Sequence, residues 1–298
     1  MSHPRLPVPA AVEADYPTSR LTTVGTGGPA RWFARPTSVA ELGDVLAWAA
    51  DAGLEIAVIG LGSNLLVADE GYDGVVIRLA GELARIERDG ESIVCGGGAS
   101  LAAIVKRATG WGLSGIEFGC AIPGTAGGAV RMNAGAYGGE IRDVLADALV
   151  IGAAGRRRGG PDELGMSYRR SAIAPGEVVA EAVLELRPGD PAQIRETVSD
   201  MQRRRREAQP AKVRTFGSVW KNPGGDRTAG RLLEECDLKG YAVGGARISP
   251  VHANFIENHD GARSADVIAL MREARRRARE REVELEHEVQ MLGPIGLD

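Results

Sequence analysis

Six glycines and one proline lie within the twenty residues from Gly119 to Gly138, in a stretch that is otherwise apolar. A chain concentrates glycine where its backbone approaches a ligand closely or adopts positive φ. Such a run offers many backbone N–H groups and few side chains, which suits a pyrophosphate. Its spacing is neither that of a P-loop nor GxGxxG. The run therefore indicates a nucleotide or flavin cradle, with a glycine-rich buried turn as the alternative.

A second glycine loop, Gly60-Leu-Gly-Ser-Asn64, also follows an apolar segment. A Rossmann domain has one such loop, which opens a helix, whereas Ser63 and Asn64 lead into strand-like residues. Two loops that converge on one diphosphate would neutralise the same charge differently, and Ser63 and Asn64 would add donors. Neither loop supplies a lysine, which suits a tightly held cofactor better than a phosphate to be transferred. The alternative is two unrelated tight turns.

The composition is that of a globular protein without a nucleic-acid or membrane partner. The 298 residues are 44% hydrophobic and 26% charged, with a formal net charge of -4. The three cysteines have no CxxC spacing, so they predict a reducing compartment without disulfides or zinc. No apolar stretch approaches the roughly 18 residues of a membrane span, and the N-terminus lacks a signal-peptide core. We expect a cytoplasmic protein without a bound metal.

Capping residues and hydrophobic periodicity predict the helices and strands that would position the two loops. Ser38 and Glu41 form a capping box, Ser100 caps a helix that stops at Gly110, and Asp190 precedes Pro191 at the start of another. A further helix is predicted from 264 to about 281. Strands are predicted at 55–59, 65–67, 75–79, 92–94, 149–151, 178–186 (alternating, with one face buried) and 283–292.

These elements divide the chain into three parts. Residues 1–20 are proline-rich and aperiodic, which predicts a loosely ordered leader. A strand-rich α+β unit follows over 21–189, and the segment Arg187-Pro-Gly-Asp-Pro191 marks its end. Residues 190–298 form a smaller α+β domain.

The segment Arg214-Thr-Phe-Gly-Ser-Val-Trp-Lys-Asn-Pro223 is rich in polar residues yet flanked by aromatic and apolar ones, as expected of a site lining. Three further motifs are Ser167-Tyr-Arg-Arg-Ser171, Ile248-Ser-Pro-Val-His-Ala-Asn-Phe-Ile-Glu-Asn258 and Leu285-Glu-His-Glu-Val289. Taken in chain order with the glycine loops, these motifs closely resemble the UDP-N-acetylenolpyruvoylglucosamine reductase family, from about Thr22 to Gly293.

The resemblance implies a fold and a reaction. The fold is α+β: an FAD-binding unit of the vanillyl-alcohol-oxidase (PCMH) type, with two subdomains that divide near 80–95, and then a substrate-binding domain. The reaction is reduction of UDP-N-acetylglucosamine enolpyruvate by NADPH, through tightly but non-covalently bound FAD, to UDP-N-acetylmuramate for peptidoglycan. The only partner expected is this small sugar nucleotide, and the protein is expected to be a monomer of the shorter of the family's two types.

The resemblance also assigns catalytic roles. Arg169 matches the arginine that binds the substrate carboxylate, and on a strand Arg170 would point to the opposite face. Ser218 matches the serine that protonates carbon. Glu288 matches a glutamate placed at the same carboxylate, with Glu286 as its rival because both residues share one face of a strand. Trp220 and His287 depart from the family pattern, in which phenylalanine and proline are common.

The binding residues follow from the loops and the motif positions. The predicted FAD contacts are Gly60, Leu61, Gly62, Ser63, Asn64, Leu65, Gly119, Ile122, Pro123, Gly124, Thr125, Gly127, Gly128, Ala129, Asn133, Gly135, Ala136 and Tyr137. The predicted substrate contacts are Tyr168, Arg169, Lys221, Asn222, His252 and Asn254. Two arginine clusters, 203–206 and 275–279, lie on predicted helices among acidic residues and are interpreted as solvated faces.

The sequence leaves two alternative functions, one enzymatic and one of ligand binding alone. One is another flavin oxidoreductase of the same cofactor fold, and the other is a flavin-binding module without catalysis. An alcohol oxidase needs no carbon-protonating serine, and a binding module has no use for the 214–223 segment.

Overall fold

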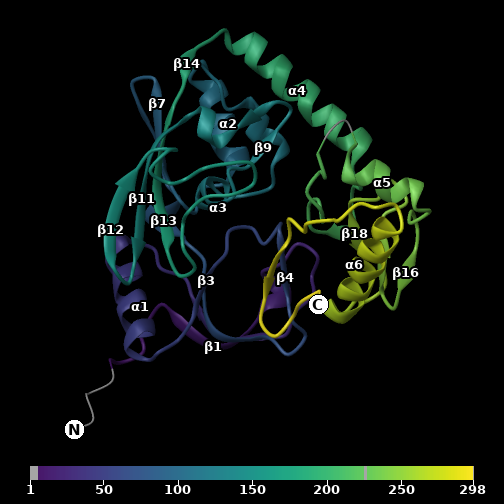
Figure 1. Ribbon diagram of the computed structural model, residues 1–298. Helices are drawn as coiled ribbons and strands as arrows, with labels where there is room; N and C mark the ends of the chain where they lie inside the picture. Colours follow the sequence, from purple (N-terminus) through teal and green to yellow (C-terminus); the bar gives the residue numbers. More distant parts are fainter. Residues whose placement is uncertain (1–5, 225–226, 298) are drawn as a thin grey trace. The chain divides into compact units, whose positions relative to one another are not determined.

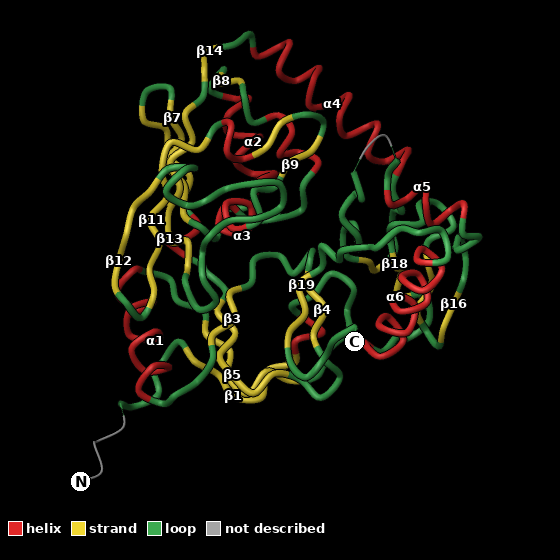
Figure 2. Tube along the Cα trace, in the orientation of Figure 1, coloured by secondary structure: helices red, strands yellow, loops and turns green. Residues whose placement is uncertain are grey.

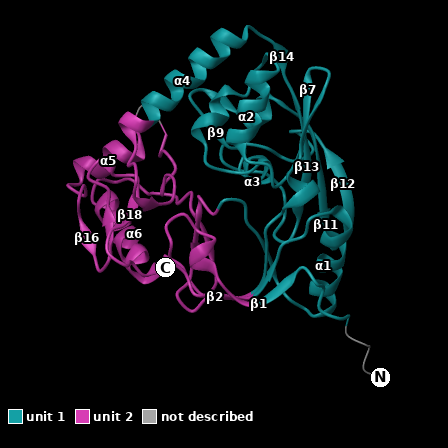
Figure 3. Cartoon of the chain, turned by 180° about the vertical axis from the view of Figure 1, so that it is seen from behind, with its two compact units in different colours: residues 1–14, 32–61, 74–205 teal, residues 15–31, 62–73, 206–298 magenta. Residues whose placement is uncertain are grey.

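The computed structural model describes residues 6–224 and 227–297. The chain folds into two compact units (Figure 3). Unit 1 comprises Met1–Ala14, Trp32–Leu61 and Gly74–Arg205, and unit 2 comprises Asp15–Arg31, Gly62–Asp73 and Arg206–Asp298. The units interleave along the sequence, whereas the domains expected from the sequence follow one another. The expected domain boundaries stay predictions.

Unit 1 is built on a five-stranded antiparallel sheet in the order β12-β11-β13-β7-β6. Helices α2 and α3 cover one face of this sheet (Figure 1). Ile104 and Val105 on the apolar face of α2 are buried in the same core as Ile93 and Leu184 of the sheet. The elements are β6 (Ile86–Asp89), β7 (Ser92–Gly96), α2 (Leu101–Gly110), α3 (Ala126–Arg131), β11 (Leu145–Gly152), β12 (Gly155–Gly159) and β13 (Val178–Glu185).

A second core in unit 1 surrounds α1 (Val39–Asp51). Leu42, Val45 and Leu46 of this helix are buried in the same core as strand residues such as Val75 and Val178. A four-stranded sheet runs in the order β1-β2-β5-β3 and consists of β1 (Val12–Pro17), β2 (Pro29–Ala34), β5 (Tyr72–Ile77) and β3 (Ile56–Val58). The last two strands are parallel.

Unit 2 has its own core, in which Phe216, Trp220, Leu232, Leu270 and Val289 are all buried. Its four-stranded sheet has the order β15-β18-β17-β16, and a separate parallel pair joins β4 to β19. Figure 2 shows the pair β4 and β19 and the helices α5 and α6 of this unit. The elements are β4 (Leu65–Val67), β15 (Arg214–Thr215), α5 (Ala229–Glu235), β16 (Ala242–Val243), β17 (Ala246–Ile248), β18 (Ile256–Asn258), α6 (Ser264–Arg279) and β19 (Gln290–Leu292).

The long helix α4 (Pro191–Ala208) and several short elements complete the chain. Helix α4 begins with the predicted cap, because Ala192 N donates to Asp190 Oδ1 at 2.9 Å. The others are η1 (Thr18–Arg20), η2 (Gly81–Ala84), β8 (Leu113–Ser114) with its partner β14 (Arg187–Pro188), η3 (Glu117–Ala121), β9 (Gly135–Ala136) with β10 (Gly139–Glu140), and η4 (Ile141–Asp143).

The predicted α+β fold class and the predicted helix starts are confirmed. Ser38 Oγ accepts from Glu41 N, and Ser100 Oγ accepts from Ala103 N. The described residues contain no helix with the length and apolar character that a membrane crossing requires.

Three details differ from the prediction. Residues 12–20 are not a loose leader, because they form β1 and η1 and the strand pairs in a sheet; residues 1–5 lie outside the described residues. The last strand is only β19, and the 283–289 segment before it makes a single bridge. Strand β13 is buried on both faces over its first three residues, so it alternates only in its second half.

Candidate active site

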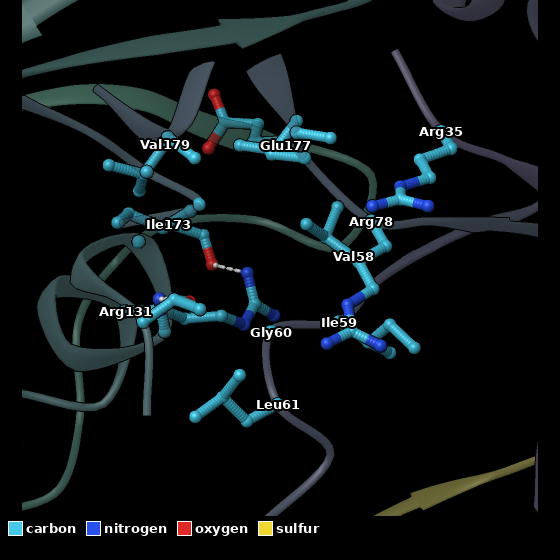
Figure 4. Close-up of a pocket in the computed structure, with 18 of the residues that line it drawn as sticks. Arg35, Val58, Ile59, Gly60, Leu61, Arg78, Arg131, Ile173, Glu177 and Val179 are labelled. Atoms are coloured by element: carbon cyan, nitrogen blue, oxygen red, sulfur yellow. Dashed lines mark hydrogen bonds between the residues drawn. The ribbon is translucent and has the colours of Figure 1, made fainter. Parts of the chain in front are cut away.

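The two glycine loops meet at one pocket in unit 1 (Figure 4). Gly60 is so close to Thr125 that a Cβ at position 60 would lie 2.4 Å from Thr125 Oγ1. Thr125 in turn caps α3, where its Oγ1 accepts from Gly128 N at 3.4 Å. Gly60, Leu61, Thr125, Gly127 and Gly128 therefore line one cavity, as expected of loops that converge on one ligand.

A third glycine segment, which the sequence analysis missed, completes this lining. Gly97 and Gly98 follow β7 and border the pocket. Gly127 N donates to Gly97 O at 2.8 Å, and a Cβ on Gly97 would lie 1.8 Å from Val179 O. Three consecutive glycines at 96–98 were the available signal, because only glycine allows backbones to approach this closely.

Three arginines, also missed, give the pocket positive charge. Arg35, Arg78 and Arg131 come from separate segments of unit 1 and border the cavity, and Arg78 and Arg131 extend toward the Gly60 loop in Figure 4. Arg131 donates to Ile173 O and Ala174 O, each at 3.1 Å, and burial lowers its pKa from the ordinary value. Glu177, on the same wall, is held by Arg157, whose hydrogen bond lowers the carboxyl pKa. The pocket thus suits an anionic ligand approached by backbone and guanidinium donors.

The other predicted cofactor contacts lie outside this lining and stay predictions. Gly62, Ser63, Asn64 and Leu65 belong to unit 2. Gly119, Ile122, Pro123, Gly124, Ala129, Asn133, Gly135, Ala136 and Tyr137 belong to unit 1 and continue the glycine run on either side of the pocket segment.

Asn133 serves as a structural link within unit 1. Its side chain is fully buried, with Nδ2 donating to Ser167 O at 3.1 Å and Oδ1 accepting from Arg142 N at 3.0 Å. The amide therefore ties the glycine run to the segment that carries Tyr168 and Arg169.

That segment is a tight turn and not the strand on which the choice of Arg169 over Arg170 was argued. Ser167 and Arg170 exchange backbone hydrogen bonds of 2.9 and 3.0 Å, and Arg169 has φ +55°. Arg169 Nη2 donates to Gly135 O at 2.7 Å, and its guanidinium lies 5.0 Å from the ring centroid of Tyr168. Arg169 is half-buried whereas Arg170 is exposed, so the turn itself separates the two side chains.

In unit 2, the segment that carries Ser218 lies beside the one that carries Glu288. Trp220 is bridged to His287, with Glu288 N donating to Val219 O at 2.8 Å and Lys221 N donating to Glu286 O at 2.9 Å. These bonds use no backbone group of His287. The pairing therefore does not depend on whether position 287 is histidine, as here, or proline, as is common in the family pattern. Ser218 is half-buried, and its near neighbours in sequence, Phe216 and Val219, are buried.

The two candidate glutamates, Glu286 and Glu288, differ in their surroundings. Lys221 Nζ pairs with Glu286, whose side chain is 72% exposed. Glu288 is half-buried, and its backbone oxygen accepts from Asn64 Nδ2 at 3.0 Å. This arrangement favours Glu288 over Glu286 as the functional residue.

The polar groups of three predicted substrate residues make contacts within unit 2. Asn254 Oδ1 accepts from Trp220 N and its Nδ2 donates to Trp220 O, each at 2.9 Å. Asn222 Oδ1 accepts from Ala229 N at 3.1 Å, at the start of α5. His252 Nδ1 accepts from Asn254 N at 3.2 Å, and burial lowers the His252 pKa, which keeps the imidazole neutral at pH 7. Their substrate contacts stay predictions.

Within the described residues, no cluster of three His, Cys, Asp or Glu side chains is arranged to hold a metal ion. Residues 209–292 match the model of the UDP-N-acetylenolpyruvoylglucosamine reductase C-terminal domain, and residues 30–158 match an FAD binding domain.

Curated relatives match almost end to end. The chain is 43% identical to UDP-N-acetylenolpyruvoylglucosamine reductase 2 of Symbiobacterium thermophilum, over 96% of this chain and 93% of that protein. It is also 43% identical to the reductase of Anaeromyxobacter dehalogenans, over 95% and 86% of the two chains. The crystal structure of the Thermus caldophilus reductase superposes with a TM-score of 0.82 at 36% identity, and covers 95% of this chain and 98% of that one.

Proposed function

Because this chain belongs to the UDP-N-acetylenolpyruvoylglucosamine reductase family, we propose that it uses NADPH and bound FAD to reduce UDP-N-acetylglucosamine enolpyruvate to UDP-N-acetylmuramate. The observation that carries the proposal is the match at 43% identity over 96% of the chain. The resemblance stated from the motifs, and the fold class it implied, are confirmed at the level of the family.

The pocket of unit 1 fits the diphosphate part of FAD. A Cβ at Gly60 would lie 2.4 Å from Thr125 Oγ1, so any larger residue there would displace the wall of the cradle. Arg35, Arg78 and Arg131 add the positive charge that a diphosphate requires. We propose that Gly60, Leu61, Thr125, Gly127 and Gly128 contact the diphosphate, with Arg131 and Arg78 beside it. When bound, the flavin supplies the hydride that adds to the terminal carbon of the substrate's vinyl group.

Arg169 is the residue proposed to take up the negative charge that this addition creates. Hydride addition moves an electron pair from the double bond onto the substrate carboxylate, which becomes an enolate-like dianion. A guanidinium held in advance at that carboxylate stabilises the charge without reorganisation. The bond to Gly135 O at 2.7 Å and the ring of Tyr168 fix the Arg169 side chain and so support this role.

Ser218 and Glu288 are proposed to complete the reaction. The Ser218 hydroxyl delivers a proton to the carbon next to the carboxylate, so that one hydride and one proton saturate the double bond. Glu288, carrying or sharing a proton, would donate a hydrogen bond to the same carboxylate. The pairing of their two segments through Val219 and Glu288 supports this assignment.

An anaerobic titration tests the proposal. NADPH should bleach the yellow purified protein, and UDP-N-acetylglucosamine enolpyruvate should restore the colour while gaining two hydrogens. NADH in a parallel titration reports the nicotinamide preference. Recovery of colour with another acceptor only would show that the substrate is wrong.

The cellular compartment and the oligomeric state belong to the same proposal. We infer that the protein acts in the cytoplasm, where its sugar nucleotide and NADPH are made available, and that it acts as a monomer. Light scattering of the FAD-loaded protein, with and without substrate, tests the oligomeric state.

A further inference from the structure

Ser63 and Asn64 lie at the junction of the Ser218 and Glu288 segments in unit 2. Ser63 O accepts from Gly217 N at 2.9 Å, directly before Ser218. Asn64 Nδ2 donates to Glu288 O at 3.0 Å, and Asn64 O accepts from Gln290 N at 3.0 Å. One dipeptide therefore holds the backbone of both segments.

This junction is anchored on its other side by regular structure. Strand β4 begins at Leu65, directly after Asn64, and runs parallel to β19, with Leu65 paired to Gln290. Leu66 of β4 and Val289 are both fully buried in the same core. Because the core fixes β4, it also restrains the adjacent Asn64, and the hydrogen bond from Asn64 Nδ2 then restrains the backbone of Glu288.

We propose that Asn64 is a positioning residue for substrate reduction, acting through the backbone of Glu288, and not through the cofactor diphosphate as its place in a glycine loop first indicated. The inference rests on the roles proposed for Ser218 and Glu288. A side chain that sets the Glu288 backbone also sets where the Glu288 carboxyl lies relative to Ser218. Small displacements of such groups cost much more in rate than in binding.

The chain offers a matched control. Asn258 Nδ2 donates to Val24 O at 2.9 Å, which is the same type of bond between distant segments of unit 2. Asn258 is on β18 and is not part of the proposed machinery. Asn258 Oδ1 also accepts from Ala262 N at 2.9 Å, so Asn258→Ala should lose at least as much stability as Asn64→Ala but show no defect in the reaction.

A two-step stopped-flow experiment tests the proposal on the FAD-loaded protein. In Asn64→Ala, we expect FAD content and flavin reduction by NADPH to stay within about twofold of the natural protein. Reoxidation by the enolpyruvyl substrate should slow by about tenfold or more. Asn64→Asp, which keeps the shape but loses the donor, should show the same pattern if the alanine variant folds poorly.

A double-mutant cycle with Glu288→Gln distinguishes a positioning role of Asn64 from a general loss of structural stability in the Asn64→Ala variant. If Asn64 acts through Glu288, Asn64→Ala should slow reoxidation much less in the Glu288→Gln background than alone. Asn258→Ala should behave additively. Loss of FAD, equal slowing of both steps, or an additive Asn64–Glu288 cycle would overturn the proposal. Absence of any reoxidation by this substrate in the natural protein would instead refute the proposed function.

Discussion

Gly60 allows the two pocket loops to touch. A Cβ there would approach Thr125 Oγ1 to 2.4 Å, and Thr125 cannot withdraw freely because it caps α3. Gly60→Ala should therefore displace the cradle. Overpacking of this kind costs about 1–3 kcal/mol, which corresponds to roughly five- to 150-fold in affinity. Equilibrium dialysis of the apoprotein with FAD measures this loss.

Gly43→Ala is the matched control for that substitution. Gly43 lies in α1, and a Cβ there would meet no atom within 4 Å. Alanine in a helix is favoured over glycine by about 1 kcal/mol, so this variant should bind FAD normally and melt slightly higher. Equal FAD affinity in both variants would contradict the proposed cradle.

His252 predicts a pH dependence of stability. Burial lowers its folded pKa below the ordinary value of 6.5. Between the two pKa values the unfolded chain binds more protons, so the free energy of unfolding rises with pH there. The contribution of the neutral His252 imidazole to the free energy of unfolding is fully present above pH 6.5 and decreases as the pH falls below that value.

Urea denaturation at about pH 7.5 and 5.5 checks this expectation. His252→Gln should lose part of the stability difference between the two pH values, whereas substitution of the exposed His259 should preserve it. An unchanged difference in His252→Gln would show that the buried imidazole is not its source.

The residues differ in how well they could be predicted from sequence. Glycine density is local, so Gly60, Thr125 and Gly127 were found from their own segments. Arg35, Arg78 and Arg131 lie far apart in the sequence and border one pocket only after folding. Asn64 was found for its place in a loop, but its bond to Glu288 joins residues 224 apart in sequence, which no local pattern reveals.

At the scale of elements, the start of α6 at Ser264 was predicted but its distant cap was not, whereas α1 and α2 begin at local caps that the sequence shows. Ser38 and Ser100 cap their own helices. The first N–H groups of α6, from Ser264 and Ala265, instead donate to the distant Asp69 carboxylate at 2.9 and 3.0 Å. The leader prediction was wrong at residues 12–17 because an edge strand is defined by its partner rather than by its own periodicity.

Asp69→Ala should therefore destabilise the protein although it lies outside α6. Loss of a helix cap costs about 0.5–2 kcal/mol, and the negative charge at the helix N-terminus adds to it. Asp73→Ala is the control, because its ion pair with Arg31 is exposed and is expected to contribute at most about 1 kcal/mol. Urea denaturation should show the larger loss for Asp69→Ala, and equal losses would refute capping by Asp69.

At the scale of the whole molecule, the glycine- and arginine-lined pocket lies entirely within unit 1. A ligand that binds only the folded state raises stability, by about 2.7 kcal/mol at a free concentration of 100 times Kd. FAD should therefore raise the melting temperature of the apoprotein in a concentration-dependent way. Riboflavin, which lacks the diphosphate, should raise it far less. Equal stabilisation by the two flavins would contradict a site built around the diphosphate.

The central claim is that Ser218 supplies the proton that completes reduction, and separate rates of the two half-reactions of Ser218→Ala test it most directly. Under anaerobic conditions, we expect NADPH to reduce the flavin of this variant within about twofold of the natural rate. The reduced variant should then be reoxidised by the enolpyruvyl sugar nucleotide about 10²–10⁴ times more slowly, as for loss of a general acid. Equal slowing of both half-reactions, or normal reoxidation, would contradict the claim.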